Sequence, residues 1–188
     1  MFLENKITFI IPSLNRTTLN RTINSLKNQK NPNWECIIIY DGVKGQLFKD
    51  DRIKILHIEK TGEVVRNTGQ SGLVRNHGIK EVKTSWIGFL DDDDTIHPNY
   101  VEDLFKKYSN YDFVIWRMKT KGGTITPPLN TNNIVFGYVG ISFCYKNIFN
   151  NVLFDSNRNG EDFDMVNKLI SLSKNYIITP EVYYNVRH

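Results

Sequence analysis

Cysteine, long apolar runs and an N-terminal leader are scarce or missing in this sequence. Its two cysteines, Cys36 and Cys144, are too few for a disulfide framework or a cysteine-based metal site. No apolar run approaches the ~20 residues that a membrane helix needs. The first residues, MFLENK, lack the apolar core of a secretion signal. We therefore expect a protein without a transmembrane segment that works in the cytoplasm.

Concentrated charge is also absent. The chain has 24 Lys and Arg against 20 Asp and Glu, which gives a net charge of +4. No block of five or more basic residues occurs, and this argues against a nucleic-acid-binding face. The same modest excess suits a small anionic ligand such as a nucleotide diphosphate.

What is present is an ordinary globular composition. Hydrophobic residues make up 40% of the 188 residues and charged residues 23%, enough for one domain with its own core. Neither an internal repeat nor a linker divides the chain, so we expect a single domain over residues 1–188.

Apolar runs alternate with amphipathic segments along most of the chain. Strands are predicted at 7–11, 35–40, 52–58, 85–90 and 112–120. Helices are predicted at 17–30, 72–83, 98–108 and 165–173. Residues 136–149 fit either state, and short strands are expected at 175–179 and 182–188. Near-continuous apolar strands joined by helices predict an α/β fold, with a mainly parallel sheet covered on both faces.

Four consecutive aspartates, Asp91 to Asp94, follow the apolar strand at 85–90. In an open parallel sheet, ligands bind beyond the carboxyl ends of the strands. Adjacent carboxylates repel one another unless a cation or hydrogen-bond donors offset their charge, and Mg²⁺ or Mn²⁺ takes oxygen ligands. The run therefore fits a divalent-metal site. It also fits a solvated acidic turn ahead of a helix.

Two other interpretations of the aspartates can be weighed. Asp91-x-Asp93-x-Thr95 after an apolar strand is similar to the nucleophile motif of haloacid-dehalogenase-type phosphatases, in which the first Asp is phosphorylated. That motif normally follows the first strand of its domain, whereas at least three strands precede it here. A calcium EF-hand loop is excluded, because Ile96 stands where that loop requires glycine.

Six further segments accompany the aspartates. They are FIIPSLNR (9–16), SLKNQ (25–29), WECIIIYDG (34–42), SGLVRNHGI (71–79), GEDFD (160–164) and VYYNVRH (182–188). Together with WIGFLDDDDTIHP (86–98), they resemble, in order and over nearly the whole chain, glycosyltransferases of the GT-A fold, most closely family 2. The resemblance implies a Rossmann-like sheet and the transfer of a sugar from a nucleotide-sugar to a hydroxyl acceptor, with inversion. Tyr40 is a departure, since the family usually has Asp there.

The resemblance implies a donor site at the strand ends. Pro12, Asn15 and Arg16 are expected at the nucleotide edge. Asp41 is expected near the base or ribose, and Arg75 near the nucleotide-sugar. UDP-sugars are the commonest donors of similar enzymes, so we expect a UDP-sugar first and a GDP-sugar second.

The resemblance also implies a metal and a catalytic base. Asp91 and Asp92 are expected to face the donor, and Asp93 to bind Mn²⁺ or Mg²⁺ between the two phosphates, with His188 completing the metal shell. Asp162 is the expected base that deprotonates the acceptor.

The acceptor side is expected in the second half of the chain. Glu161 is the expected acceptor contact, with a glycan or another hydroxyl compound as the acceptor. Residues 1–95 would form the nucleotide-binding half and residues 96–188 the acceptor half, with possible help from a second subunit in a homo-oligomer. The loop at 59–71 is expected to order over the donor and exclude water.

Simpler interpretations stay open at this point. Asp41-Gly42 also fits a plain turn, Arg75 fits a helix surface, and Asp162 fits a cap for a helix that begins at Met165. A degenerate domain that binds nucleotide-sugars or glycans without turnover is the non-enzymatic alternative.

Overall fold

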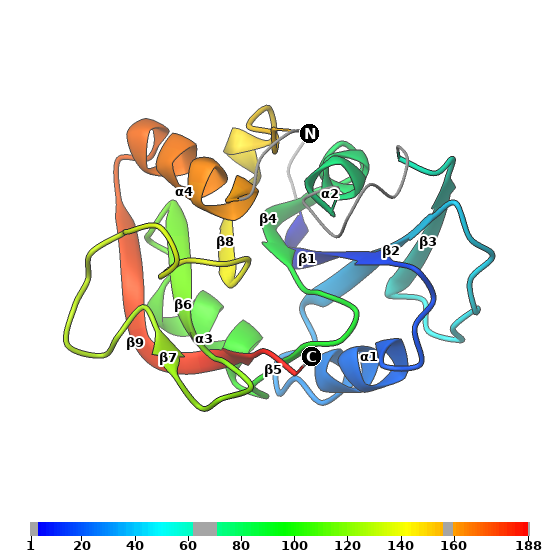
Figure 1. Ribbon diagram of the computed structural model, residues 1–188, viewed down its shortest axis with the longest axis horizontal. Helices are drawn as coiled ribbons and strands as arrows, with labels where there is room; N and C mark the ends of the chain where they lie inside the picture. Colours follow the sequence, from blue (N-terminus) through cyan, green and yellow to red (C-terminus); the bar gives the residue numbers. More distant parts are fainter. Residues whose placement is uncertain (1–3, 62–70, 156–159, 188) are drawn as a thin grey trace.

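The N-terminal part of the chain forms a parallel sheet around its first strand. The computed structural model describes residues 4–61, 71–155 and 160–187 (Figure 1). Strand β1 (Glu4–Ser13) lies between β2 (Trp34–Asp41) and β4 (Thr84–Phe89), with β3 (Ile53–Ile58) beyond β2. All three pairings are parallel. The carboxyl ends of these strands therefore meet at one edge of the sheet.

The C-terminal part continues the same sheet with mixed pairing. The strand order is β3-β2-β1-β4-β8-β6-β9-β5, and β7 pairs with β6. The added strands are β5 (Thr95–Ile96), β6 (Phe113–Lys119), β7 (Ile125–Thr126), β8 (Phe143–Lys146) and β9 (Tyr176–Asn185). Strand β8 is antiparallel to both of its neighbours, whereas β6 and β9 are parallel. The short strand β8 thus joins the parallel strands β1 to β4 to a C-terminal part of mixed pairing.

Helices cover both faces of this sheet. Helices α2 (Ser71–Ile79) and α4 (Glu161–Leu172) lie above the sheet in Figure 1, and α1 (Leu19–Lys27) lies below it. Helix α3 (Tyr100–Lys107) packs its first residue onto Phe9 of β1, with ring centroids 5.4 Å apart. The predicted α/β architecture with helices on both faces is confirmed.

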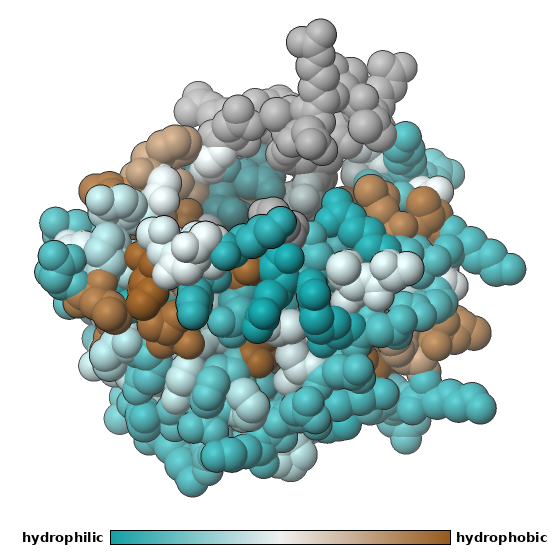
Figure 2. Space-filling model, turned by 60° about the horizontal axis from the view of Figure 1, so that its bottom comes forward, coloured by the Kyte–Doolittle hydropathy of each residue, from teal (hydrophilic) through white to brown (hydrophobic). Residues whose placement is uncertain are grey.

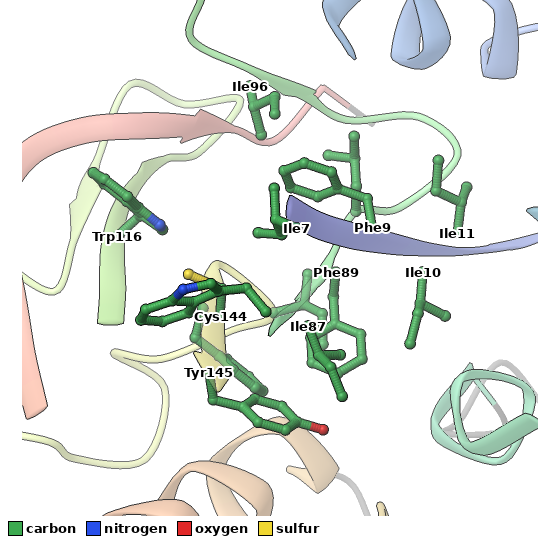
Figure 3. Close-up of a cluster of buried hydrophobic side chains, with 14 of the residues drawn as sticks. Ile7, Phe9, Ile10, Ile11, Ile87, Phe89, Ile96, Trp116, Cys144 and Tyr145 are labelled. Atoms are coloured by element: carbon green, nitrogen blue, oxygen red, sulfur yellow. The ribbon is translucent and has the colours of Figure 1, made fainter. Parts of the chain in front are cut away.

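The core follows from the alternation of side chains along β1. Phe9 and Ile11 point to the α1 side of the strand, and Ile10 points to the opposite side (Figure 3). All three are fully buried, because each face of the sheet has its own layer of helices. Trp116 of β6 extends this core, with its ring 4.5 Å from that of Tyr100. Such burial explains why the strand reads as an unbroken apolar run.

Several element boundaries differ from the sequence prediction. Helix α4 begins at Glu161 and not at Met165, since Gly160 adopts a left-handed φ of 98° and Phe163 packs edge-on against Phe136. The two short strands expected at the C-terminus are one continuous strand, β9. The ambiguous segment at 136–149 contains β8 and a 3₁₀ helix (Asn147–Phe149).

Some large apolar side chains are exposed on the surface. Figure 2 shows a face that is mostly hydrophilic, with small apolar areas set apart from one another. Among the residues that the structure describes, the exposed large apolar side chains are Leu14, Leu47, Leu129, Val135, Phe136, Tyr138, Ile148, Leu172 and Tyr176. Within the described ranges, none of the helices is both long and apolar enough to cross a bilayer.

Close packing of α2 on the sheet yields a first prediction. A Cβ at Gly78 would lie 2.7 Å from Ile10 Cγ2 and 2.9 Å from Ile39 Cδ1, both in the buried core. Gly78→Ala gains ~1 kcal/mol of helix propensity but overpacks the core by ~1–3 kcal/mol. We expect net destabilisation, measured as a lower urea midpoint. Gly122→Ala is the control, because nothing lies within 4 Å of its Cβ position. Equal midpoints for the two variants would contradict this packing.

Candidate active site at the carboxyl edge of the sheet

The acidic turn, Asp91–Asp94, follows β4 at the edge where the parallel strands end. Its backbone is held from α1. The Thr22 hydroxyl donates to the Asp94 carbonyl at 2.8 Å, and Arg21 Nη2 donates to the Asp93 carbonyl at 2.8 Å. These bonds fix the main chain of the turn, so that the carboxylates have defined positions.

Two carboxylates of the turn face the end of β1. The Ser13 hydroxyl donates to Asp92 Oδ2 at 2.7 Å. Arg16 Nη1 lies 2.9 Å from Asp93 Oδ2 and 3.5 Å from Asp92 Oδ1. Burial raises the pKa of Asp92, although Ser13 and Arg16 partly oppose the shift. The last residue of β1, Ser13, and the nearby Arg16 therefore offset part of the charge of this part of the turn.

Arg75 of α2 lies among three further carboxylates, those of Asp91, Glu161 and Asp162. Its Nη2 donates to Asp91 Oδ1 at 2.6 Å, and its Nη1 donates to Glu161 Oε1 at 3.1 Å. Asp162 Oδ1 lies 3.8 Å from the same Nη1. Burial alone would lower the pKa of Arg75, but the three carboxylates around it raise that pKa above its ordinary range. The guanidinium thus connects the acidic turn to the first turn of α4.

One guanidinium does not compensate three carboxylates. Glu161 is buried, its Oε2 accepts the Gly72 N–H at 3.2 Å, and burial raises its pKa to about 7. Burial also raises the pKa of Asp162. The cluster therefore retains a proton more readily than isolated carboxylates would.

Asp162 presents one oxygen inward and keeps partial contact with solvent. Its Oδ1 is buried and has no hydrogen-bond partner within the described ranges, while the side chain as a whole is 28% exposed. A carboxyl group with a raised pKa that keeps partial contact with solvent is suited to receive a proton from a bound hydroxyl.

The end of β9 also reaches the acidic turn. The Arg187 N–H donates to Asp94 Oδ1 at 2.9 Å, and the Asp91 N–H donates to the Tyr184 hydroxyl at 3.2 Å. Burial raises the pKa of Asp94 to about 6. His188, which was expected to complete a metal shell, lies outside the described residues.

The nucleotide-edge residues shape the loops beside the turn. Pro12 lies in β1, opposite Ile39 of β2. Asn15 has a left-handed φ of 61°, and its Oδ1 accepts the Gln46 N–H at 3.3 Å. The buried Tyr40 donates its hydroxyl proton to the Gln46 carbonyl at 3.0 Å. The tyrosine thus supports the loop that follows its own strand.

Asp41 is joined to the segment after β3. Its Oδ1 accepts the Thr61 N–H at 2.7 Å, and its Oδ2 accepts the Thr61 hydroxyl at 3.0 Å. Asp41 therefore does more than end a strand in a turn. Residues 62–70 of the loop expected to order over the donor lie outside the described residues.

Most of the predicted site residues meet at this edge. The structure brings Arg16, the acidic turn, Arg75, Glu161 and Asp162 into two connected clusters that share the turn. Two of the simpler interpretations are wrong. Arg75 is 3% exposed and so is no surface residue, and Asp162 lies inside α4 and not ahead of it.

Two residues of the site were not predicted from the sequence. Ser13 binds Asp92, and the hydroxyl of Tyr184 accepts from the Asp91 N–H. For Ser13 a signal existed, since it lies at the carboxyl end of a buried strand, where ligands bind in such sheets. Tyr184 gave no local signal, because its partner is 93 residues away.

The donor set of the turn fits a hard divalent cation. All of its side-chain ligands are carboxylate oxygens, which Mg²⁺ and Mn²⁺ prefer. In the part of the chain that the structure describes, no group of three or more His, Cys, Asp or Glu is arranged to hold a metal. Mg²⁺ typically uses only one or two protein carboxylates together with substrate phosphates. Asp91, which pairs with Arg75, and Asp93, which pairs with Arg16, meet that requirement.

Comparison with known proteins assigns the family. Residues 8–176 match the model of glycosyl transferase family 2. The chain belongs to this family. The phosphatase interpretation of the acidic turn is therefore set aside.

Similar curated proteins are named bacterial glycosyltransferases. The poly(ribitol-phosphate) β-N-acetylglucosaminyltransferase TarP of Staphylococcus aureus is 32% identical over 129 residues, which is 62% of this chain and 38% of TarP. The putative glycosyltransferase EpsH of Bacillus subtilis is 33% identical over 109 residues, 53% of this chain and 29% of EpsH. The match thus spans well under half the length of these relatives.

Solved structures confirm the GT-A fold. S. aureus TarS 1–349 superposes with a TM-score of 0.75 at 18% identity, over 97% of this chain and 60% of that one. The mannosyltransferase PcManGT of Pyrobaculum calidifontis, solved with GDP-Man and Mn²⁺, superposes with a TM-score of 0.67 at 12% identity, over 98% of this chain and 57% of that one. At these identities the likeness concerns the fold alone.

The protonation of Glu161 yields a second prediction. Its folded-state pKa of about 7 exceeds the ordinary value of 4.5, so between these values the folded chain binds more protons than the unfolded chain. Stability that Glu161 contributes below this window is lost as pH rises through it. Relative to the wild type, the free energy of unfolding of Glu161→Gln should therefore rise by on the order of 1–3 kcal/mol between about pH 5 and about pH 8.

Urea unfolding at the two pH values measures this difference. Glu59→Gln, an exposed carboxyl outside the cluster, is the control and should keep the wild-type pH profile. Parallel profiles for Glu161→Gln and the wild type would show that Glu161 is ionised throughout this range.

Proposed function

We propose that this chain binds a nucleotide-sugar along the carboxyl edge of the sheet and transfers the sugar to an acceptor hydroxyl, with inversion. The observation that carries the proposal is the double contact of Arg75. Its guanidinium binds Asp91 of the acidic turn on one side and lies against Glu161 and Asp162 on the other. A donor-binding turn and a proton acceptor are thereby held at one site.

The donor is a UDP-sugar by preference and a GDP-sugar as the second choice. S. aureus TarS, which shares the fold, has been solved with UDP-GlcNAc and with UDP, and PcManGT with GDP-Man. The name of TarP describes an N-acetylglucosaminyltransferase. These names support a nucleotide-sugar donor, and the net charge of +4 suits its diphosphate.

Asp93, with Asp91 beside it in the turn, would hold a divalent ion in the proposed reaction. When bound, Mn²⁺ or Mg²⁺ would supply electrostatic stabilisation of the leaving diphosphate. Asp91 is itself held by Arg75, so that its orientation toward the donor is fixed. The chain's own contribution at this end of the site is to orient the donor.

Asp162 acts at the other end as the general base. Its carboxylate accepts the proton of the acceptor hydroxyl while the acceptor oxygen attacks C1 of the sugar. The C1–O bond to the acceptor forms as the bond to the diphosphate breaks, and the proton stays on Asp162. Glu161 holds Arg75 and Gly72 in place through its two oxygens, so it orients this base.

The role of Asp162 yields a third prediction. Asp162→Asn keeps the shape of the side chain but removes the base, so turnover should fall by ~10²–10⁴-fold. Donor affinity should change little. Release of UDP from UDP-GlcNAc in the presence of Mn²⁺ measures turnover, and the shift in melting temperature with increasing donor concentration measures binding.

Asp164→Asn is the matched control, since Asp164 also lies in the first turn of α4 and carries the same charge near the helix N-terminus. It should retain turnover. Full activity of Asp162→Asn would eliminate Asp162 as the base. A wild-type chain that binds the donor but never turns over would instead support the binding-only alternative.

The metal role yields a fourth prediction. Asp93→Asn should abolish the extra thermal stabilisation that Mn²⁺ gives in the presence of UDP-GlcNAc, because the amide is a weaker ligand without charge. Asp51→Asn, an exposed aspartate ahead of β3, should behave like the wild type. An unchanged response of Asp93→Asn to Mn²⁺ would rule out Asp93 as the metal ligand.

A further inference from the structure

Arg16 forms an ion pair with Asp93, the carboxylate that is proposed to bind the metal. Its Nη1 lies 2.9 Å from Asp93 Oδ2 and 3.5 Å from Asp92 Oδ1. A guanidinium and a divalent ion repel each other, and both seek the same oxygen. In the free protein, the Arg16 guanidinium is therefore a cation that contacts the proposed metal site.

The backbone before Arg16 directs it to this position. Asn15 has a left-handed φ of 61°, which turns the chain sharply after β1. The Ser13 hydroxyl accepts the Asn15 N–H at 2.9 Å and donates to Asp92 Oδ2 at 2.7 Å. One serine thus connects the bend that carries Arg16 to the turn that carries the carboxylates.

The two sides of this ion pair differ in their freedom to move. The side chain of Arg16 is 54% exposed, whereas those of Asp92 and Asp93 are 7% and 10% exposed. The carboxylates lie in a turn whose carbonyls are held by Arg21 and Thr22. When a competing cation arrives, the arginine is the partner that can leave into solvent.

We propose that Arg16 is a built-in competitor for the metal, which offsets part of the negative charge of Asp92 and Asp93 in the free protein and must withdraw before a divalent ion binds Asp93. The proposal rests on the metal site of the proposed function. It adds that Arg16 lowers the intrinsic affinity of the site for the ion. The free protein thereby avoids the cost of uncompensated, nearly buried carboxylates.

The test is a titration with Mn²⁺ alone, without any nucleotide, followed by the electron paramagnetic resonance signal of free Mn²⁺. Arg16→Gln should bind Mn²⁺ about two- to fivefold more tightly than the wild type, as expected for loss of a half-exposed ion pair. Combining it with Asp93→Asn should remove this gain, which places the effect at the proposed ligand.

Arg187→Gln is the matched control. It removes one exposed positive charge next to the same turn, and it keeps the backbone N–H of residue 187 that donates to Asp94 Oδ1. Its gain in Mn²⁺ affinity should be smaller than that of Arg16→Gln. Equal gains in the two variants would mean that only the overall electrostatic potential at the site changes, and would overturn the proposal. Thermal unfolding in metal-free buffer shows whether each variant is folded.

The remaining outcomes separate this proposal from the proposed function. Mn²⁺ binding through Asp93 that is insensitive to Arg16→Gln overturns the competition and leaves the transferase intact. Absence of Mn²⁺ binding in every variant also overturns the competition. In that case, UDP release from UDP-GlcNAc, measured with and without a chelator, decides on its own whether sugar transfer stands.

Discussion

The site depends on one buried guanidinium that lies among three carboxylates. Arg75 joins Asp91, which follows β4, to Glu161 and Asp162 in the first turn of α4. Without this cation, the acidic groups would repel one another across the sheet edge. Removing one partner from a buried ion pair costs on the order of 3–5 kcal/mol, because the other charge is left uncompensated. The same contact therefore supports both the fold and the arrangement of the site.

Much of the fold was readable from local patterns. The strands β1, β2 and β4 are buried on both faces, so their near-continuous apolar sequences predict parallel strands. The location of the acidic turn follows from the same reasoning, because ligand-binding residues collect where parallel strands end. The antiparallel insertion of β8 was not predictable in this way. A four-residue apolar strand carries no mark of its direction or of its neighbours.

The partnerships within the site were harder to foresee than its members. Arg75 looks like a surface residue in its own helix, and its burial becomes favourable only through carboxylates that lie 16 and 86 positions later in the chain. The start of α4 was placed too late because Glu161 and Asp162 precede the first apolar residues of its periodic face. Their charges belong inside the protein only because Arg75 meets them there. Periodicity records which residues are apolar, and it does not record such pairings.

Two hydrogen bonds between the acidic turn and the C-terminal end of β9 affect the order in which the site assembles. The Asp91 N–H reaches Tyr184, and the Arg187 N–H reaches Asp94, each across 93 residues. Contacts of such sequence separation form late, since closing a long loop is entropically costly. During synthesis the parallel strands β1 to β4 emerge well before β9 is available to them. This edge of the sheet is thus completed after its scaffold, and a nascent chain lacks these contacts until β9 has docked.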